Sequence, residues 1–312
     1  MKRTLTVPPL PAPERLDKFL IRQFPESGRA YWRKYLEATV RVDGKKAAKG
    51  RLLSGGETLE LNETPPAADA EIAANPDLPL TLLYEDAHLL AADKPAGLPC
   101  YPLRPGESRT LAQAVAARYP AQRSLRPARE AGLVYRLDND TSGVLLFARD
   151  PEALAAFRKL SRSGAMEKIY LALVEGSLPE GGTVRRPIAH HPKNRKKMRV
   201  VEPEGESWDL PAQPAETVFE SLAEFQGQTL LRVAIRVGRR HQIRAHLAAL
   251  GHPIVGDVLY GAAPRPELGR HCLHAAEIRF AHPFTGTPTV IAAPQPKEWA
   301  YFATDPRVGT PS

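Results

Sequence analysis

The stretch Val134-Tyr135-Arg136-Leu137-Asp138-Asn139-Asp140-Thr141-Ser142-Gly143-Val144-Leu145-Leu146-Phe147 places six turn-forming residues, 138–143, between two apolar runs. The run from Val144 to Ala148 predicts a buried strand. We therefore expect a loop with two carboxylates and two hydroxyls, held by a rigid sheet. In an arbitrary loop, Asp138 or Asp140 would simply accept a hydrogen bond from the backbone two residues further on.

Residues 136–143 also fit a longer pattern, Arg-Leu-Asp-x-x-Thr-Ser-Gly. This pattern resembles the signature of the RluA-type pseudouridine synthases, in which the aspartate is catalytic. The resemblance implies that Asp138 is catalytic. Because a carboxylate can attack and then leave, Asp138 is our candidate for the nucleophile, and we assign Arg136 to an RNA contact. Family members commonly carry histidine before the arginine, whereas this chain has Tyr135.

Three further motifs resemble those of the same family: Lys94-Pro95-Ala96-Gly97-Leu98-Pro99, Lys168-Ile169-Tyr170, and Gly238-Arg239-Arg240-His241-Gln242-Ile243-Arg244-Ala245-His246. The resemblance implies that Tyr170 lies in the active site and that Arg239 pairs with Asp138. We assign Lys168 and Arg244 to RNA contacts. On residue type alone, a tyrosine in a strand is usually a packing residue, and 94–99 is a Pro-Gly loop that shapes its surroundings.

Composition excludes several classes of protein. Hydrophobic residues make up 43% of the 312 residues, but no apolar run approaches the roughly 20 that a membrane span needs. The N-terminus lacks the apolar core of a signal peptide, so we expect a cytoplasmic protein without membrane contact. Cys100 and Cys272 predict buried thiols. A metal site is not expected, because His241 and His246 are five positions apart and do not share a helix face.

Charge divides the chain into three parts. Residues 1–62 hold 13 lysines and arginines against 7 acids, residues 63–78 hold 4 acids and no base, and the remainder is again basic. We predict a small domain at 14–62, a linker at 63–78 and a catalytic domain at 79–303, with residues 1–13 disordered or draped. Two basic bodies suit a polyanionic partner.

The predicted small domain contains two helices followed by a Val-x-Val-Asp-Gly-Lys hairpin and a closing strand. This order resembles the S-four-type RNA-binding domain that often precedes these synthases. The resemblance and the basic helices indicate Arg29, Arg33, Lys34 and Lys45 as phosphate contacts. The alternative is a basic solvated face without a partner.

In the large domain we predict an α+β fold around a mixed, largely antiparallel sheet with a central cleft, as the resemblance implies. Helices are predicted at 111–119, from Pro151, and within 238–250. The predicted strands are 80–84, 89–92, 144–148, 167–174, 230–237, 273–280 and 287–293.

The function predicted from these motifs is isomerisation of uridine to pseudouridine in RNA by a monomer. Because no electrons change hands and no group is lost, no cofactor is expected. The front domain favours large-subunit ribosomal RNA, and transfer RNA is the alternative substrate. A non-catalytic RNA-binding or ribosome-assembly protein would be expected to lose Asp138, Tyr170 or Arg239. A glycoside hydrolase would need a second placed carboxylate.

Overall fold

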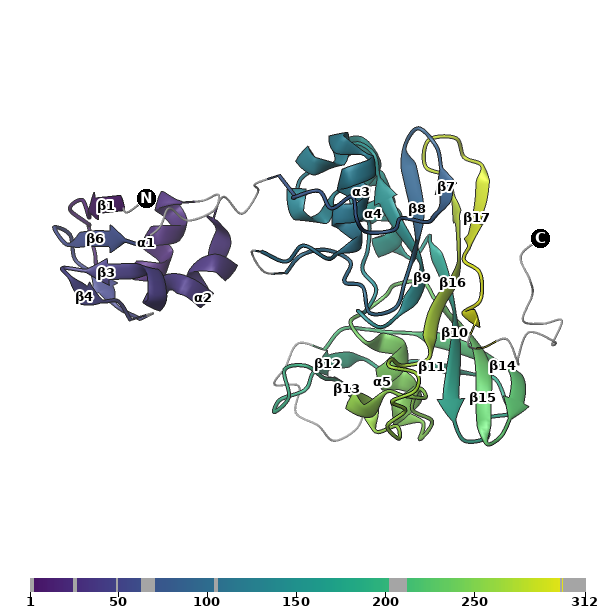
Figure 1. Ribbon diagram of the computed structural model, residues 1–312. Helices are drawn as coiled ribbons and strands as arrows, with labels where there is room; N and C mark the ends of the chain where they lie inside the picture. The colour runs from purple at the N-terminus through teal and green to yellow at the C-terminus, as the bar shows by residue number, and fades with distance from the viewer. Residues whose placement is uncertain are drawn as a thin grey trace. The chain divides into compact units, whose positions relative to one another are not determined.

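The computed structural model describes residues 3–24, 27–48, 50–62, 71–103, 106–201, 212–297 and 299. The chain divides into two compact units, Met1–Glu71 and Ile72–Ser312. Figure 1 labels the helices and strands of both units. Each unit is described by itself below.

The N-terminal unit contains two helices and short antiparallel strands around a core of its own. Leu16, Leu20, Trp32 and Leu36 are among the side chains fully buried in this core, which accounts for the helical spacing of the apolar residues. The elements are β1 (Arg3–Thr6), α1 (Leu16–Gln23), α2 (Gly28–Thr39), β3 (Val40–Val42), β4 (Lys45–Lys46) and β6 (Thr58–Leu61), with β2 (Glu14–Arg15) paired to β5 (Leu52–Leu53). The sheet order is β1-β6-β3-β4.

The two ends of this unit differ from the predicted boundaries. The prediction that residues 1–13 are disordered or draped is wrong for Arg3–Thr6, because β1 pairs with β6 along its whole length and Val7 is buried. Residues 63–70 lie outside the described residues. Ile72 and Leu78 are buried against the second unit, so the last part of the predicted linker packs as part of that unit.

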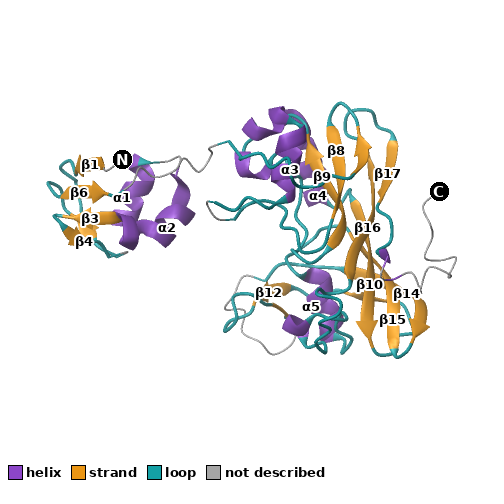
Figure 2. Ribbon diagram, viewed as in Figure 1, coloured by secondary structure: helices purple, strands orange, loops and turns teal. Residues whose placement is uncertain are grey.

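The second unit is built on one mixed sheet. Among the described residues, nine strands pair in the order β11-β14-β15-β10-β16-β9-β8-β7, with β17 paired to β16. Every pairing is antiparallel except the one between β9 and β16. Strands predominate over helices in this unit, as Figure 2 shows. The predicted mixed, largely antiparallel sheet is therefore confirmed.

The predicted elements of this unit occur in the predicted order, but four strands, β11 to β14, were not predicted. The strands are β7 (Leu82–Glu85), β8 (Leu89–Lys94), β9 (Ser142–Ala148), β10 (Glu167–Glu175), β11 (Gly182–Val184), β12 (Ile188–His190), β13 (Met198–Val200), β14 (Thr217–Phe225), β15 (Gln228–Ile235), β16 (Leu273–Ala281) and β17 (Pro288–Ala292). The helices are α3 (Leu111–Arg118), α4 (Pro151–Ser163) and α5 (Gln242–Ala249). As predicted, Asp150 caps α4, accepting a hydrogen bond from the Ala153 amide at 2.8 Å.

Two apolar cores cover the faces of this sheet. Leu145 and Phe147 on β9 contribute to one core, together with α3 and α5, whereas Leu146 joins the other core with Phe157 of α4. This alternation explains why β9 reads as a continuous apolar run, since both of its faces are buried. The central strands therefore form a rigid base for the loops at their ends.

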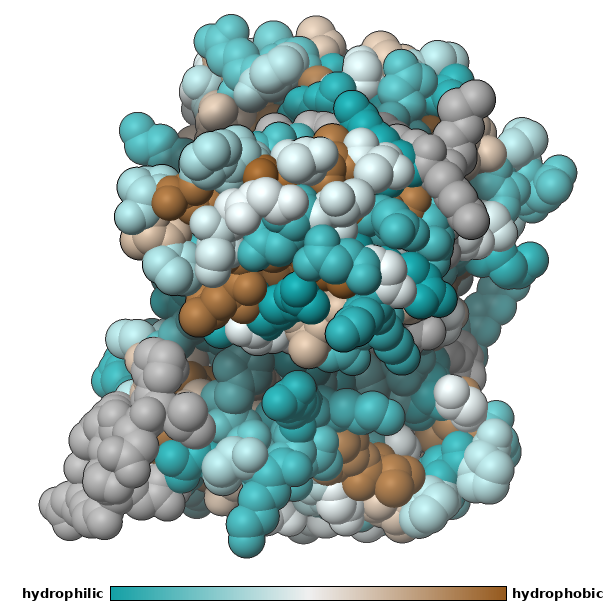
Figure 3. All heavy atoms as spheres, turned by 90° about the vertical axis from the view of Figure 1, so that its left-hand side faces the viewer, coloured by the Kyte–Doolittle hydropathy of each residue, from teal (hydrophilic) through white to brown (hydrophobic). Residues whose placement is uncertain are grey.

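The surface contrasts with these cores. Hydrophilic side chains predominate on the face of the molecule drawn in Figure 3, and hydrophobic ones are scattered among them. None of the helices within the described ranges has the length and apolar character required to cross a bilayer.

Candidate active site

The loop between η3 (Ala128–Glu130) and β9 borders a pocket of about 810 Å³. Its walls come from six parts of the chain: residues 99–103 with Glu107, the 134–141 loop, the end of α4, β10, residues 235–244 and Leu273 of β16. Asp138, Tyr170, Arg239 and Arg244 all line it. The motifs that are scattered along the sequence therefore meet at one place.

The Thr-Ser-Gly half of the central motif connects the loop to β16 and to His271, which precedes that strand. The Thr141 hydroxyl lies 2.9 Å from Nε2 of His271, and the Ser142 hydroxyl lies 2.8 Å from Nδ1 of His274. Gly143 has a φ of +107°, and a Cβ at this position would lie 2.1 Å from the Ala275 carbonyl oxygen. Only glycine permits the close parallel pairing of β9 with β16.

The Lys94–Pro99 motif holds the other side of the loop. Lys94 is fully buried, and its ammonium donates hydrogen bonds to the carbonyls of Pro95, Leu98 and Asn139 at 2.7 to 2.9 Å. Burial lowers the pKa of Lys94 to about 8, so it remains mostly charged at neutral pH. The predicted structural role of this motif in shaping the pocket is consistent with these contacts.

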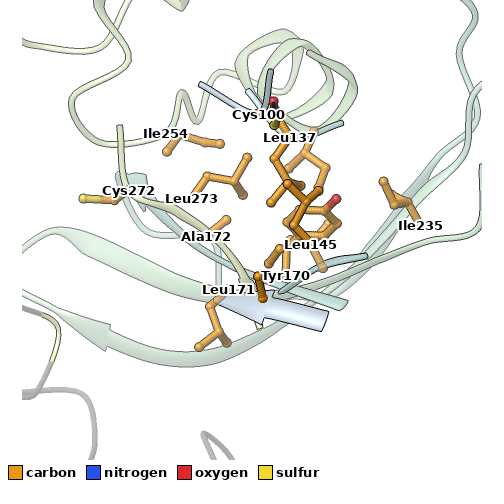
Figure 4. Packing of buried hydrophobic residues seen from close by; sticks show 14 of the residues in the cluster. Cys100, Leu137, Leu145, Tyr170, Leu171, Ala172, Ile235, Ile254, Cys272 and Leu273 are labelled. Carbon is orange, nitrogen blue, oxygen red and sulfur yellow. Dashed lines mark hydrogen bonds between the residues drawn. The ribbon is translucent and has the colours of Figure 1, made fainter. Parts of the chain in front are cut away.

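Cys100 adds a further contact to the same loop. Its thiol donates to the Leu137 carbonyl at 3.2 Å, and Figure 4 shows the two side chains next to each other. The backbone is therefore held at both residues that flank Asp138.

Arg244 is the arginine that pairs with Asp138. Its Nη1 donates to Oδ2 of Asp138 at 2.8 Å, while Nε and Nη2 donate to the two carboxylate oxygens of Asp257 at 2.6 and 2.8 Å. The Arg244 side chain is 8% exposed and that of Asp257 is 2% exposed. One guanidinium thus joins two carboxylates, with the bidentate contact made to Asp257.

The predicted pairing of Arg239 with Asp138 is wrong. Nε of Arg239 donates to the Pro214 carbonyl at 3.2 Å, and its side chain lies at the rim of the pocket. The reason is the turn before α5, where His241 adopts a left-handed φ of +52° and the helix begins only at Gln242. Arg239 precedes this turn, whereas Arg244 lies in the first turn of α5 and reaches Asp138.

His241 lies on the other side of Asp138. Its Nε2 is 3.8 Å from Oδ1 of Asp138, and its Nδ1 is 3.1 Å from the Tyr260 hydroxyl. That hydroxyl also accepts a hydrogen bond from the Met198 amide at 2.9 Å. The tautomer in which Tyr260 donates to Nδ1 leaves the ring proton on Nε2, facing Asp138.

The charge state of Asp138 results from opposing effects. Burial on its own would raise the pKa of Asp138, but His241 and Arg244 lower it to below the ordinary value of 3.8. Burial in turn lowers the pKa of His241 to about 4, so this ring is neutral at neutral pH. Arg244 is therefore the group that keeps Asp138 ionised at neutral pH.

Tyr170 faces the same pocket from β10. Its ring is 6% exposed, and its hydroxyl has no hydrogen-bond partner within the described ranges. Burial, together with the negative charge of Asp138, raises the pKa of Tyr170 above its ordinary value of 10.0. The residue is thus a protonated phenol whose hydroxyl is available to a ligand.

The predicted RNA contacts fall in different surroundings. Arg136 lines the pocket and donates to the Tyr101 hydroxyl at 3.1 Å. Lys168 is 4% exposed, its ammonium lies 5.0 Å from the centroid of the Tyr135 ring, and burial lowers its pKa to about 8. Lys45 is exposed on β4, and the side chains of Arg29, Arg33 and Lys34 lie outside the described residues.

Tyr135, the departure from the family pattern, is a packing residue here. Its hydroxyl donates to the Val144 carbonyl at 3.0 Å, and its ring packs against both apolar cores. It therefore supports the start of β9 instead of contacting Asp138.

Asp257 and Tyr260 were not among the site residues predicted from the sequence. Both belong to the Gly251–Gly261 segment, which follows the Gly238–His246 motif closely in the sequence. This proximity was the sequence feature that could have indicated their role. No group of three or more metal-ligating side chains occurs in the part of the chain that the structure describes.

Comparisons with known proteins all match pseudouridine synthases. The family model described as RNA pseudouridylate synthase matches residues 88–249. The chain is 36% identical to "Ribosomal large subunit pseudouridine synthase D" of Xanthomonas campestris, over 95% of this chain and 90% of that protein. It is 32% identical to the protein of the same name from Escherichia coli O6:H1, over 91% and 88% of the two chains. It is also 39% identical to an RNA pseudouridine synthase of Chloroflexus aurantiacus, over 95% and 91%.

Among solved structures, the fold is similar to that of human RNA Pseudouridylate Synthase Domain Containing 1. The TM-score is 0.54 at 23% identity, covering 75% of this chain and 87% of the human one. At this level of identity the similarity concerns the fold alone.

Proposed function

This chain belongs to the RNA pseudouridylate synthase family, and on that basis we propose that it isomerises a uridine of large-subunit ribosomal RNA with Asp138 as the nucleophile. The observation that carries the assignment of Asp138 is its ion pair with a buried arginine at the wall of the pocket. The printed names of the relatives that align with nearly the whole chain support ribosomal RNA as the substrate.

The reaction requires three changes at one nucleotide. The bond between N1 of uracil and the anomeric carbon breaks, the base rotates, and carbon 5 is joined to the same anomeric carbon. Carbon 5 loses its proton, and N1, which is no longer bonded to the sugar, gains one. A carboxylate suits this sequence because it can attack an electrophilic carbon and later leave. Atoms and charge balance without an added reactant.

Asp138 meets the requirements of such a nucleophile. It is ionised at neutral pH, because Arg244 offsets the cost of desolvation. One of its oxygens accepts a hydrogen bond from Arg244, whereas Oδ1 accepts none from the residues that the structure describes and lies 3.8 Å from Nε2 of His241. The carboxylate thus keeps an oxygen with lone pairs directed to a substrate.

Tyr170 is proposed to stack on the uracil and to handle the proton of carbon 5. In the free enzyme Tyr170 is protonated and its phenolate form is scarcely populated, because burial and the Asp138 charge raise its pKa. Once Asp138 is bonded to the nucleotide its charge is gone, so one cause of the raised pKa is removed. The phenol then loses its proton to solvent more readily, and the resulting phenolate takes the proton of carbon 5 at the stage that needs a base.

The RNA has to present the uridine unstacked. Turning a base out of a folded RNA costs a few kcal/mol, which contacts elsewhere must offset. We propose that the N-terminal unit is an S-four-type RNA-binding domain that contributes such contacts. Its excess of lysine and arginine and the exposed Lys45 on β4 support this role.

Asp138→Asn tests the assignment of the nucleophile. Pseudouridine should disappear at one position when ribosomal RNA from cells carrying this variant is mapped chemically, although the variant protein binds the RNA as the wild type does. Turnover by purified Asp138→Asn enzyme would contradict the assignment. Loss of pseudouridine from transfer RNA alone would instead move the substrate to that class.

A further inference from the structure

A second hollow of about 440 Å³ lies against β10, β14 and β15. It has an apolar lining that includes Pro187, Pro214 and Val218, and Val218 is 42% exposed. Val237 and Arg239 line both this hollow and the catalytic pocket, so the two lie next to each other.

Arginines and glutamates alternate at its rim. Arg185 pairs with Glu216, and Arg236 lies 3.6 Å from Glu167 with 69% of its side chain exposed. Because the glutamates offset most of the charge, the hollow is not primarily a phosphate site. The planar guanidinium groups above an apolar floor instead provide surfaces for stacking.

We propose that this hollow binds the base of a nucleotide that flanks the target uridine. This inference rests on the proposed function and adds a binding site to it. A uridine that leaves its stack exposes the face of its neighbour, and an apolar surface next to the catalytic pocket would take up that face. The site would therefore contribute to the energy needed for unstacking and to the choice of sequence context.

Val218→Asp tests the site, and Val290→Asp is the matched control. Both valines are exposed strand residues, but Val290 on β17 lines neither hollow. With transcribed large-subunit ribosomal RNA fragments as the probe, Val218→Asp should raise KM by about 5- to 100-fold, which corresponds to the loss of one stacked base. The kcat at saturation should stay within a few-fold of wild type, and Val290→Asp should change neither constant.

Arg236→Gln provides a second variant at an exposed position in case Val218→Asp does not fold. It should raise KM in the same direction, with kcat preserved. Equal KM values for wild type, Val218→Asp and Arg236→Gln would overturn the flanking-base site. That result would leave the proposed function intact, because the function fails only if the wild-type enzyme makes no pseudouridine.

An independent inference concerns Asp257. The geometry points to Asp257 as a positioning residue that fixes the plane of Arg244 and limits its contact with Asp138 to one hydrogen bond. Asp257 occupies Nε and Nη2, so only Nη1 is directed to Asp138. A guanidinium free to turn would bind both oxygens of Asp138 and engage the lone pairs that attack the substrate.

The position of Asp257 is itself fixed by backbone contacts. Its amide donates to the Ile254 carbonyl at 2.9 Å, and its carbonyl accepts from the amides of Tyr260 and Ala262. The Tyr260 ring lies against Arg244, with 5.1 Å between its centroid and Cζ. Asp257 and Tyr260 thus hold Arg244 from two sides.

A pH profile distinguishes positioning from a purely structural role. The titratable groups around Asp138 are Arg244, Asp257, His241, His271, Tyr170, Tyr260, Lys94 and Cys100. In Asp257→Asn, one negative charge near Asp138 is lost, so the acid limb of kcat/KM should move to lower pH. The kcat should fall by about 10- to 100-fold, with KM nearly unchanged.

Asp140→Asn is the matched control, because it removes a carboxylate from the catalytic loop without touching Arg244. Asp257→Glu keeps the negative charge but moves the carboxylate relative to Nε and Nη2 of Arg244. It should therefore lower kcat with little movement of the acid limb of kcat/KM. A wild-type kcat and acid limb in Asp257→Asn would overturn the inference. If that variant does not fold, a wild-type kcat in Asp257→Glu would overturn it.

Discussion

Replacing Arg244 by lysine tests the central ion pair of the site. Arg244 makes three charged hydrogen bonds from one plane, two to Asp257 and one to Asp138. A lysine ammonium is a single point on a flexible stem and cannot span both carboxylates in this geometry. We therefore expect Arg244→Lys to keep one contact at most and to leave one buried carboxylate poorly paired.

The magnitude follows from the contacts that are lost. A hydrogen bond to a charged group contributes about 1.5 to 3 kcal/mol, so losing two should lower the free energy of unfolding by about 3 to 6 kcal/mol. Loss of the aimed contact to Asp138 should reduce kcat by about 10- to 100-fold, which equals about 1.4 to 2.8 kcal/mol of activation free energy. Denaturant unfolding and single-turnover kinetics at saturating RNA measure the two effects separately.

Arg239→Lys is the control, since it makes the same substitution five positions earlier in the sequence. Within the described part of the chain, its guanidinium donates to the Pro214 carbonyl at the pocket rim, so stability should change by no more than about 0.5 kcal/mol. Its kcat should stay within a few-fold of wild type. A large loss of kcat in Arg239→Lys together with normal turnover in Arg244→Lys would refute the assignment of Arg244.

Three more expectations concern the site and the N-terminal unit. Tyr170→Phe keeps the stacking face, so binding should be preserved while turnover falls at least about 10-fold; full activity in a rapid-quench assay would leave stacking as the only role. Because the pKa of Asp138 is lowered, its charge is present above pH 3.8 and is lost only as the pH falls through the lower folded value. The acid limb of kcat/KM should therefore lie below about pH 4, and a limb near pH 6 in a protein shown to be folded would disprove this charge state. A fragment of residues 72–312 should bind RNA more weakly than the full chain. Its slope of log affinity against log salt concentration should be flatter by about 0.7 for each lost phosphate contact, and an unchanged affinity would show that the N-terminal unit does not contact this RNA.

The sequence predicted the strands and helices well where periodicity was strong. The apolar run of β9 and the alternation in β15 led to correct elements, because burial of these faces dominates their conformation. The strand Arg3–Thr6 was missed, since four residues before a proline-rich segment carry little pattern. Only its pairing with β6, which is far along the chain, makes it a strand.

The residues that line the site were largely predicted from the sequence, but the arginine that pairs with Asp138 was not. Asp138, Tyr170 and Arg244 do meet at one pocket, yet which arginine reaches Asp138 depends on the left-handed turn at His241. A single histidine with positive φ is not visible in a sequence pattern, because its cost is offset by contacts distant in the chain. The same holds for Asp257, whose role appears only once α5 and the following turn are packed together.

The way the catalytic loop is held also bears on how freely this enzyme can vary. Lys94 and the Gly97 amide bind the carbonyl of Asn139, so a backbone atom, present in every amino acid, provides the contact. The Asn139 side chain is exposed and, among the described residues, donates a hydrogen bond to its neighbour Asp140. Evolution can therefore replace both residues between Asp138 and Thr141, and tune what the loop presents to different RNAs, without displacing the nucleophile.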